Sequence, residues 1–260
     1  MRVRWLGVTA TLALLILWSA ISGLRLTPEL FLPSPAKVIG ALWINWPDII
    51  YHTAATGGRA VLGFCAGTVL GLGLGVLMSW NRTWFGLLDV VVESVRPVPA
   101  VAAIPFMILW LGPTLQAQLL LITLSCGCVV AVDVYIAITT VNPLMVRAAQ
   151  CLGASRSALY REVLLPIIVP RLSGLRIAAA LSYSITVAAE FAGAQWSLGG
   201  LIMRARRSLD TETILLAMII VGMLARATDL TIRSILRRLS RWAEPTTLAL
   251  YGLERRENLS

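Results

Sequence analysis

The chain has 260 residues, of which 58% are hydrophobic and 13% charged, and its net charge at pH 7 is +9. A soluble domain of this length cannot bury so much apolar surface in one core, so the composition excludes an ordinary soluble protein and indicates that lipid surrounds much of the chain. The apolar runs are far longer than barrel strands, and backbone amides in lipid need internal partners, so an all-α integral membrane protein is predicted. Nucleic-acid binding is not indicated, because the arginines lie scattered between apolar segments, as in cytosolic loops of membrane proteins.

Six apolar segments are predicted to cross the membrane as helices, at 5–24, 54–79, 86–111, 115–138, 172–193 and 212–236. The first also has the basic start of a secretory signal, but its length and the lack of a small-x-small cleavage site favour an uncleaved helix. An even number of crossings places both termini on one side. The excess of arginines in the loops on that side predicts that both termini are cytosolic.

The second segment carries glycines at every fourth residue, namely Gly63, Gly67, Gly71 and Gly75. This spacing puts them on one helix face, which is predicted to pack closely against another helix. The alternative is that glycine is merely common in membrane helices, since Gly73 breaks the regularity.

The third segment contains Arg96, Pro97, Pro99 and Pro105. Proline removes a backbone donor and clashes with the preceding turn, so a break or kink is predicted between Arg96 and Pro105. Two interpretations remain open. The broken backbone lines a translocation path with Arg96, Pro99 and Pro105 as candidate residues, or a short amphipathic helix lies at the cytosolic interface with Glu93 and Arg96 paired.

Asp133, Glu190 and Asp229 lie within apolar segments, where a charge costs on the order of 3 kcal/mol. Each is a candidate for the translocation path, Glu190 above all, or else lies near a helix end and bonds to backbone or to arginine. No catalytic, cofactor or metal site is predicted. The chain has one histidine, no carboxylate dyad and no GxxxxGK[ST] phosphate loop, so ATP would have to bind to another chain.

A polar interlude follows the fourth segment at 139–171. It contains three short sequence motifs, Ala148-Ala149, Gly153-Ala154-Ser155 and Leu165-Pro166. This pattern resembles the EAA loop of the membrane subunits of bacterial ABC importers, in which the loop forms a coupling helix that sits in a groove of the ATPase. Arg147 stands where the pattern has glutamate. Two possibilities follow: the partner carries a compensating acid, or this contact does not matter here.

Further motifs resemble one branch of that family, the permeases for nitrate, sulfonates, taurine and related small molecules. They are Leu32-Pro33-Ser34-Pro35, the set His52, Thr56 and Arg59, Arg96-Pro97-Val98-Pro99, Pro105 to Gly112, Ala189-Glu190, and Leu198-Gly199-Gly200-Leu201-Ile202. The resemblance runs from about residue 28 to Trp242.

The resemblance implies a type I ABC importer permease of about six helices that is not an enzyme and has no cofactor of its own. It would move an aliphatic sulfonate, taurine, nitrate or a similar anion across the bacterial inner membrane by alternating access. Its partners would be a cytosolic ATPase dimer that binds ATP and Mg, an extracytoplasmic solute-binding protein, a second permease copy in a homodimer, and membrane lipid. The chain would consist of a first helix with an external segment at 1–53, a core permease domain at 54–244 and a cytosolic tail at 245–260.

Alternatives of other kinds remain. The same architecture could import bicarbonate or a pyrimidine or vitamin precursor, and a vitamin or amino-acid importer would share the interlude but lack the other motifs. An intramembrane lipid-modifying enzyme would need convergent acids and histidines, which this chain does not offer.

Arg204, Arg206 and Arg207 fall on the predicted outer side, against the charge rule. We hypothesise that they receive an anionic substrate or an acidic face of the binding protein. Contact with lipid phosphates is the alternative.

Overall fold

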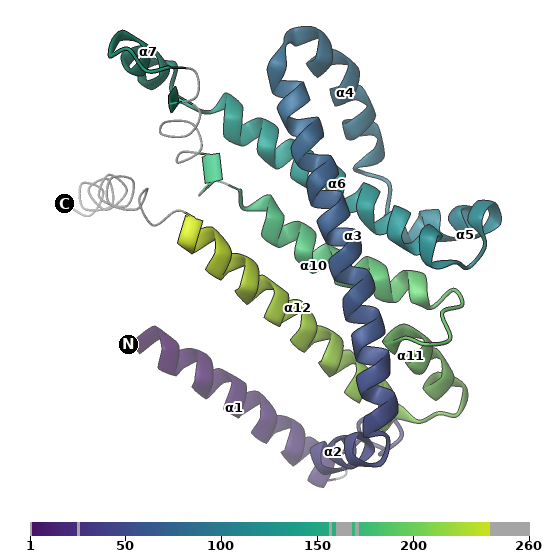
Figure 1. The fold of residues 1–260 in the computed structure, drawn as a ribbon. Helices are drawn as coiled ribbons and strands as arrows, with labels where there is room; N and C mark the ends of the chain where they lie inside the picture. Colours follow the sequence, from purple (N-terminus) through teal and green to yellow (C-terminus); the bar gives the residue numbers. More distant parts are fainter. Residues whose placement is uncertain (1, 25–26, 156–157, 160–167, 170–171, 240–260) are drawn as a thin grey trace. The chain divides into compact units, whose positions relative to one another are not determined.

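The computed structural model describes residues 2–24, 27–155, 158–159, 168–169 and 172–239. Within these ranges the chain is helical and contains no strand, so the predicted all-α class is confirmed. The helices are α1 Arg2–Gly23, α2 Pro35–Ile44, α3 Trp46–Trp80, α4 Arg82–Val95, α5 Ala100–Leu111, α6 Leu115–Thr139, α7 Pro143–Cys151, α10 Gly174–Glu190, α11 Leu198–Arg207 and α12 Thr211–Leu239 (Figure 1).

The described helices include three that are long and apolar enough to cross a membrane, α3, α6 and α12. A fourth crossing results if α4 and α5, which are bent by 94° at their junction, form one broken span. Helix α1 has 22 residues, whereas the 17 residues of α10 are fewer than the roughly 20 of a straight crossing. The count of six crossings therefore stays a prediction.

One helix boundary differs from the prediction, and the predicted break in the third segment is present. Helix α3 begins at Trp46 instead of residue 54, because Pro47 is tolerated in a first helical turn and Asp48 favours the positive end of the helix dipole. The predicted break in the third segment lies at its beginning, between Val95 and Ala100, and α5 continues through Pro105. This break falls within the predicted interval from Arg96 to Pro105.

By its internal contacts the chain divides into two compact units, Met1–Gly58 with Thr186–Leu224, and Arg59–Ile185 with Ala225–Ser260. The first unit has an apolar core of Val38, Ala41, Ile49 and Leu216, against which Trp18 packs. The proline-rich motif before α2 begins that helix: Ser34 caps it by accepting from the Lys37 N–H, and Pro35 takes the first helical position.

In the second unit, the glycine face of α3 packs against α6, as predicted. A Cβ atom built on Gly71 would lie 2.6 Å from both the Gly127 carbonyl oxygen and the Val130 Cβ, and one on Gly75 would lie 2.7 Å from the Ala131 oxygen. Gly63 and Gly67 make equally close approaches, whereas Gly73 faces no described atom within 4 Å. Helix α4 turns back beside the end of α3 (Figure 1), where Met78, Val92 and Cys128 form a buried cluster.

A buried polar network in the first unit joins α11 to α3 and α10. The Glu190 side chain is 1% exposed, and its carboxylate accepts hydrogen bonds from the Thr56 hydroxyl at 2.9 and 3.0 Å and from the Gly199 N–H at 3.0 Å. Thr56 Oγ1 in turn accepts from the Leu198 N–H at 2.9 Å. Two amides at the start of α11 thus find acceptors, and the positive end of its dipole lies beside the carboxylate.

This close approach explains a glycine of the Leu-Gly-Gly motif. A Cβ on Gly199 would lie 2.6 Å from the Glu190 Cβ and 2.9 Å from the Val187 carbonyl oxygen. Ser197 completes the start of the helix, since its side chain accepts from the Gly200 N–H at 2.9 Å. The motif therefore allows α11 to begin directly on the buried carboxylate.

The glycine face gives a first prediction. Gly71→Ala should lower the free energy of unfolding by about 1–3 kcal/mol, because the added methyl group overlaps α6. Gly73→Ala, two residues away on the same helix, should cause no loss. Thermal unfolding midpoints of the two variants in detergent micelles check this, and equal midpoints would contradict the close α3–α6 contact.

The hydrogen bonds between Thr56, Glu190 and the start of α11 give a second prediction. Thr56→Val should lower the free energy of unfolding by about 1–3 kcal/mol, because the Leu198 N–H and the Glu190 carboxylate each lose a partner in a buried site. Thr56→Ser keeps the hydroxyl and should remain within about 1 kcal/mol of the wild type. The same unfolding measurement applies, and a valine variant as stable as the serine variant would refute the network.

Candidate functional site

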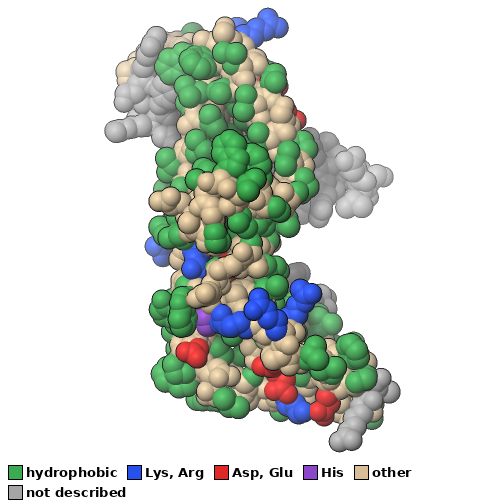
Figure 2. Space-filling model, turned by 90° about the vertical axis from the view of Figure 1, so that its right-hand side faces the viewer, with side chains coloured by type: hydrophobic (Ala, Val, Ile, Leu, Met, Phe, Trp, Pro, Cys, Tyr) green, Lys and Arg blue, Asp and Glu red, His purple; other side chains and the backbone are tan. Residues whose placement is uncertain are grey.

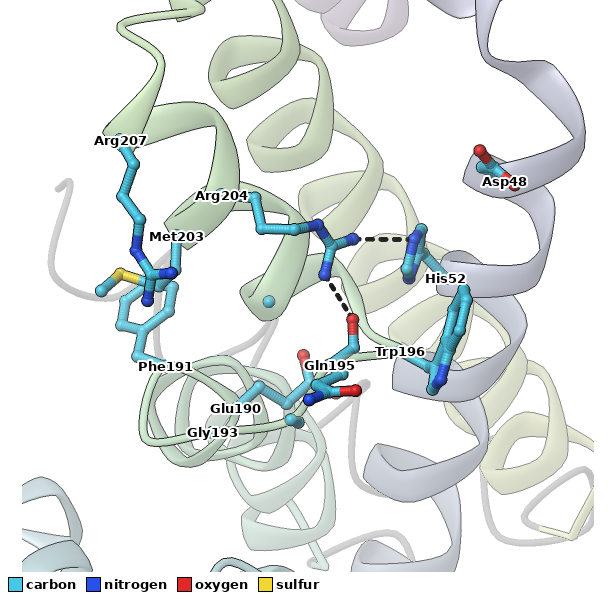
Figure 3. A pocket seen from close by; sticks show the side chains of 12 residues that line it. Asp48, His52, Glu190, Phe191, Gly193, Gln195, Trp196, Met203, Arg204 and Arg207 are labelled. Atoms are coloured by element: carbon cyan, nitrogen blue, oxygen red, sulfur yellow. Dashed lines mark hydrogen bonds between the residues drawn. The ribbon is translucent and has the colours of Figure 1, made fainter.

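A pocket of about 620 Å³ lies in the first unit, beside α11 (Figure 3). It is formed by the start of α3, the connection between α10 and α11, and α11 itself. Its lining residues are Asp48, His52, Glu190, Phe191, Gly193, Ala194, Gln195, Trp196, Gly200, Met203, Arg204 and Arg207. Two members of the predicted basic cluster and one predicted translocation residue therefore meet at one pocket.

Arg204 is held in place by uncharged groups. Its guanidinium donates to the Gln195 carbonyl oxygen and to His52 Nε2, the latter at 3.0 Å (Figure 3). Because a guanidinium only donates, Nε2 must accept, so His52 is neutral and carries its proton on Nδ1. The His52 ring is 3% exposed and stacks on Trp196 at a centroid distance of 5.9 Å. The positive charge of Arg204 is therefore oriented without being neutralised by these contacts.

Arg206 and Arg207 differ in where they lie. Arg207 lines the pocket and Arg206 does not, although both are exposed on the last turn of α11. Neither makes an ion pair with another described residue. Figure 2 shows a group of basic side chains next to the single histidine of the chain. The predicted cluster of three thus separates into two pocket residues and one outside it.

Glu190 lines the same pocket, but its carboxylate is already engaged with Thr56 and α11. This geometry matches the alternative that an embedded acid bonds to backbone near a helix end. Its role in a translocation path stays a prediction. The same alternative describes Asp133 and Asp229, which bond to the start of α10 and to arginines.

The other translocation candidates, Arg96, Pro99 and Pro105, lie in the second unit. Arg96 ends α4 and forms an ion pair with Glu93 at 3.6 Å, the pair that the interface-helix interpretation predicted. Both side chains are more than half exposed, so the pair contributes little to stability. Pro99 precedes α5 and Pro105 lies within it.

The predicted coupling region begins with α7, which ends in a Schellman motif. The Ala154 N–H donates to the Ala149 carbonyl and the Gly153 N–H donates to the Gln150 carbonyl, both at 3.0 Å. Gly153 has a φ of +79°, a conformation that glycine adopts without strain. The interval between the two alanines and the glycine in the loop pattern is therefore the interval that this helix ending requires.

Helix α7 has no buried residue. Arg147 and Ala148 are exposed, and so are the apolar side chains of Leu144 and Leu152, the latter by 88%. Ser155 follows as an exposed cap that accepts from the Ala158 N–H at 3.2 Å. Leu165 and Pro166, which the loop pattern also includes, lie outside the described residues.

The end of the interlude is attached to two other helices of the second unit. Asp133 on α6 accepts from the Gly174 N–H at 2.9 Å and from the Ser173 hydroxyl at 3.5 Å, at the first turn of α10. Arg176, one turn further, donates to Asp229 on α12 at 2.7 Å. Arg226 and Arg233 also contact Asp229, so this carboxylate is surrounded by three guanidinium groups.

Sequence reasoning missed that the pocket also involves Asp48, His52 and Trp196. His52 and Thr56 were recognised only as parts of a family motif. Their spacing of four places both on one face of α3, which was the available signal. Nothing in the local sequence indicates that this face meets residues 190–204.

Comparison with known proteins identifies relatives along most of the chain. It is 34% identical over 245 residues to the taurine transport system permease protein TauC of Escherichia coli K12, covering 91% of this chain and 89% of that protein. It is 28% identical over 245 residues to the putative aliphatic sulfonates transport permease protein SsuC of Bacillus subtilis 168, covering 93% and 89%.

The fold also matches a solved permease. The crystal structure of an amino acid ABC transporter with histidines aligns with a TM-score of 0.58 at 17% identity, over 77% of this chain and 96% of that one. The sequence pattern of the family described as binding-protein-dependent transport system inner membrane component matches residues 67–244. The relatives are transporter permease subunits and not enzymes, and a separate ATPase hydrolyses the ATP. The chain belongs to the inner membrane components of binding-protein-dependent transport systems.

Proposed function

We propose that this permease imports a small sulfonate or a similar organic anion, and that its ATPase docks on α7 and the loop around Gly153. The relatives named for taurine and aliphatic sulfonates support the substrate class. The observation that carries the docking site is that α7 buries no residue in the chain itself and presents apolar side chains, Leu144 and Leu152, to the surroundings. A partner surface would remove them from water.

In this proposal both termini and α7 face the cytosol, and α11 with its arginines faces the exterior. A solute-binding protein delivers the solute there, and a second copy of the chain completes the path. The segments 1–53, 54–244 and 245–260 serve as first helix, core and tail. Nitrate, bicarbonate and vitamin precursors are the competing substrates.

The attachments at the end of the interlude supply a mechanism for coupling. Closure of the ATPases moves α7 and the loop, and Asp133 and Asp229 tie the first turn of α10 to α6 and α12. A displacement of the loop is then passed to three helices instead of being absorbed in one flexible joint. The permease contributes two alternative packings, and the ATPase and the binding protein bias the equilibrium between them.

The substrate class is tested in proteoliposomes that contain the permease, its ATPase and the binding protein. ATP-dependent uptake of labelled taurine or ethanesulfonate is expected, with nitrate and riboflavin as comparison solutes. Uptake of a comparison solute alone would overturn the proposed class.

Gly153→Asp should detach the ATPase while the permease remains in the membrane, because aspartate at a φ of +79° strains the end of α7 by about 1 kcal/mol and changes the docking surface. Ser155→Asp is the matched control. It adds the same charge two residues later and keeps a side chain that caps the next turn. Copurification of the ATPase measures docking, and an undiminished yield with Gly153→Asp would show that the site is misplaced.

Asp133→Leu should leave the ATPase bound but lower the solute imported per ATP hydrolysed, because the Gly174 N–H loses its acceptor on α6. Asp133→Asn keeps a carbonyl oxygen for this bond and should retain most of the coupling. The ratio of uptake to ATP hydrolysis in proteoliposomes distinguishes the two variants. An unchanged ratio in the leucine variant would exclude this attachment as part of the coupling.

A further inference from the structure

We infer that the pocket beside α11 is a binding subsite for the anionic head of an organic solute, with Arg204 and Arg207 as its cationic groups. This inference rests on the proposed import of an organic anion and extends it to particular side chains of the permease. Of the three clustered arginines, it assigns Arg204 and Arg207 to the subsite and leaves Arg206 outside it.

The lining of the pocket holds two arginines and two acids, Asp48 and Glu190. Arg204 and Arg207 are three residues apart on α11, which places both on one side of the helix, and both line the pocket. Of the acids in the lining, Glu190 is buried and bonded to Thr56 and Gly199, and Asp48 makes no ion pair with a described residue. Two guanidinium groups at one pocket repel each other, and a bound anion would relieve this repulsion.

Arg204 is oriented in advance. Two of the five N–H donors of its guanidinium are used by His52 and by the Gln195 carbonyl. The remaining donors are available to a ligand, and the two contacts hold the group so that binding costs less side-chain entropy. A sulfonate or carboxylate suits the planar guanidinium, because two of its oxygens can accept parallel hydrogen bonds from the N–H groups.

The rest of the lining points to an organic anion. Phe191, Trp196 and Met203 supply apolar surface, and Figure 3 shows the Arg207 side chain extending toward Phe191. A volume of about 620 Å³ falls in the range of small-molecule sites. The pocket thus suits a charged head with a short hydrocarbon body better than a bare inorganic ion.

Arg206 provides a matched control. It lies on the same turn of α11, is exposed and has the same charge, but it does not line the pocket. Replacing it removes the same charge from the same end of the helix. Any general effect on net charge, helix dipole or binding-protein steering would appear equally in Arg206→Gln and Arg207→Gln.

The experiment measures binding of labelled taurine and ethanesulfonate to the permease–ATPase complex in nanodiscs, without the binding protein. Arg207→Gln should weaken binding about tenfold or more, as expected for the loss of a charge-assisted hydrogen bond. Arg206→Gln should change it by less than about twofold, and Arg207→Lys should recover part of the loss. Arg204→Gln should also weaken binding, but Arg207 is the cleaner test because Arg204 also hydrogen-bonds to His52 and Gln195, and its loss would disturb the pocket lining itself.

The lipid of the nanodisc separates two sources of the anion. In zwitterionic lipid, a loss confined to the pocket arginines supports a solute subsite. If phosphatidylglycerol abolishes sulfonate binding by the wild type, and Arg207→Gln changes nothing in zwitterionic lipid, the pocket holds a lipid headgroup and the inference is overturned.

The outcomes also separate this inference from the proposed function. Equal binding by Arg206→Gln and Arg207→Gln, with wild-type sulfonate uptake intact, overturns the subsite alone. Absence of sulfonate uptake by the complete wild-type system overturns the proposed function first.

Discussion

The carboxylate of Glu190 is the group on which the first unit depends. It is almost completely buried, and it is tolerated there because Thr56 and the first amides of α11 supply hydrogen bonds and a positive dipole end. The network fixes where α11 begins, and therefore where Arg204 and Arg207 project, six and nine residues after Leu198. The hydrogen bonds of this buried acid therefore hold the start of α11 in place, whether or not Glu190 also contacts the solute.

Sequence patterns predicted the helical class, the glycine face of α3 and the location of the interlude, because each follows from local composition and periodicity. The glycine face is confirmed because residues spaced four apart lie on the same face of a helix. The start of α3 was placed too late, since the polar residues around Asp48 hide a helix whose apolar pattern begins later. The bend in the third segment was predicted from its prolines, and it lies within the predicted interval, before Ala100.

The pocket could not be predicted in this way. Its defining contacts join residues far apart in the chain: Thr56 and Glu190 are separated by 134 positions, and His52 and Arg204 by 152. No local pattern encodes such pairings. The resemblance to permeases includes the motif of His52 and Thr56 and the motifs around Glu190 and Gly199 as separate segments. The structure shows that hydrogen bonds join these segments.

Arg147 carries a consequence for assembly. The loop pattern that this segment resembles has glutamate at this place, and here an exposed guanidinium occupies it on α7. If α7 docks as proposed, an ATPase groove that attracts a glutamate would repel Arg147. The electrostatic repulsion would increase as the interface excludes water. If this contact is made, the charge reversal would favour an ATPase whose groove carries an acid over one whose groove binds glutamate.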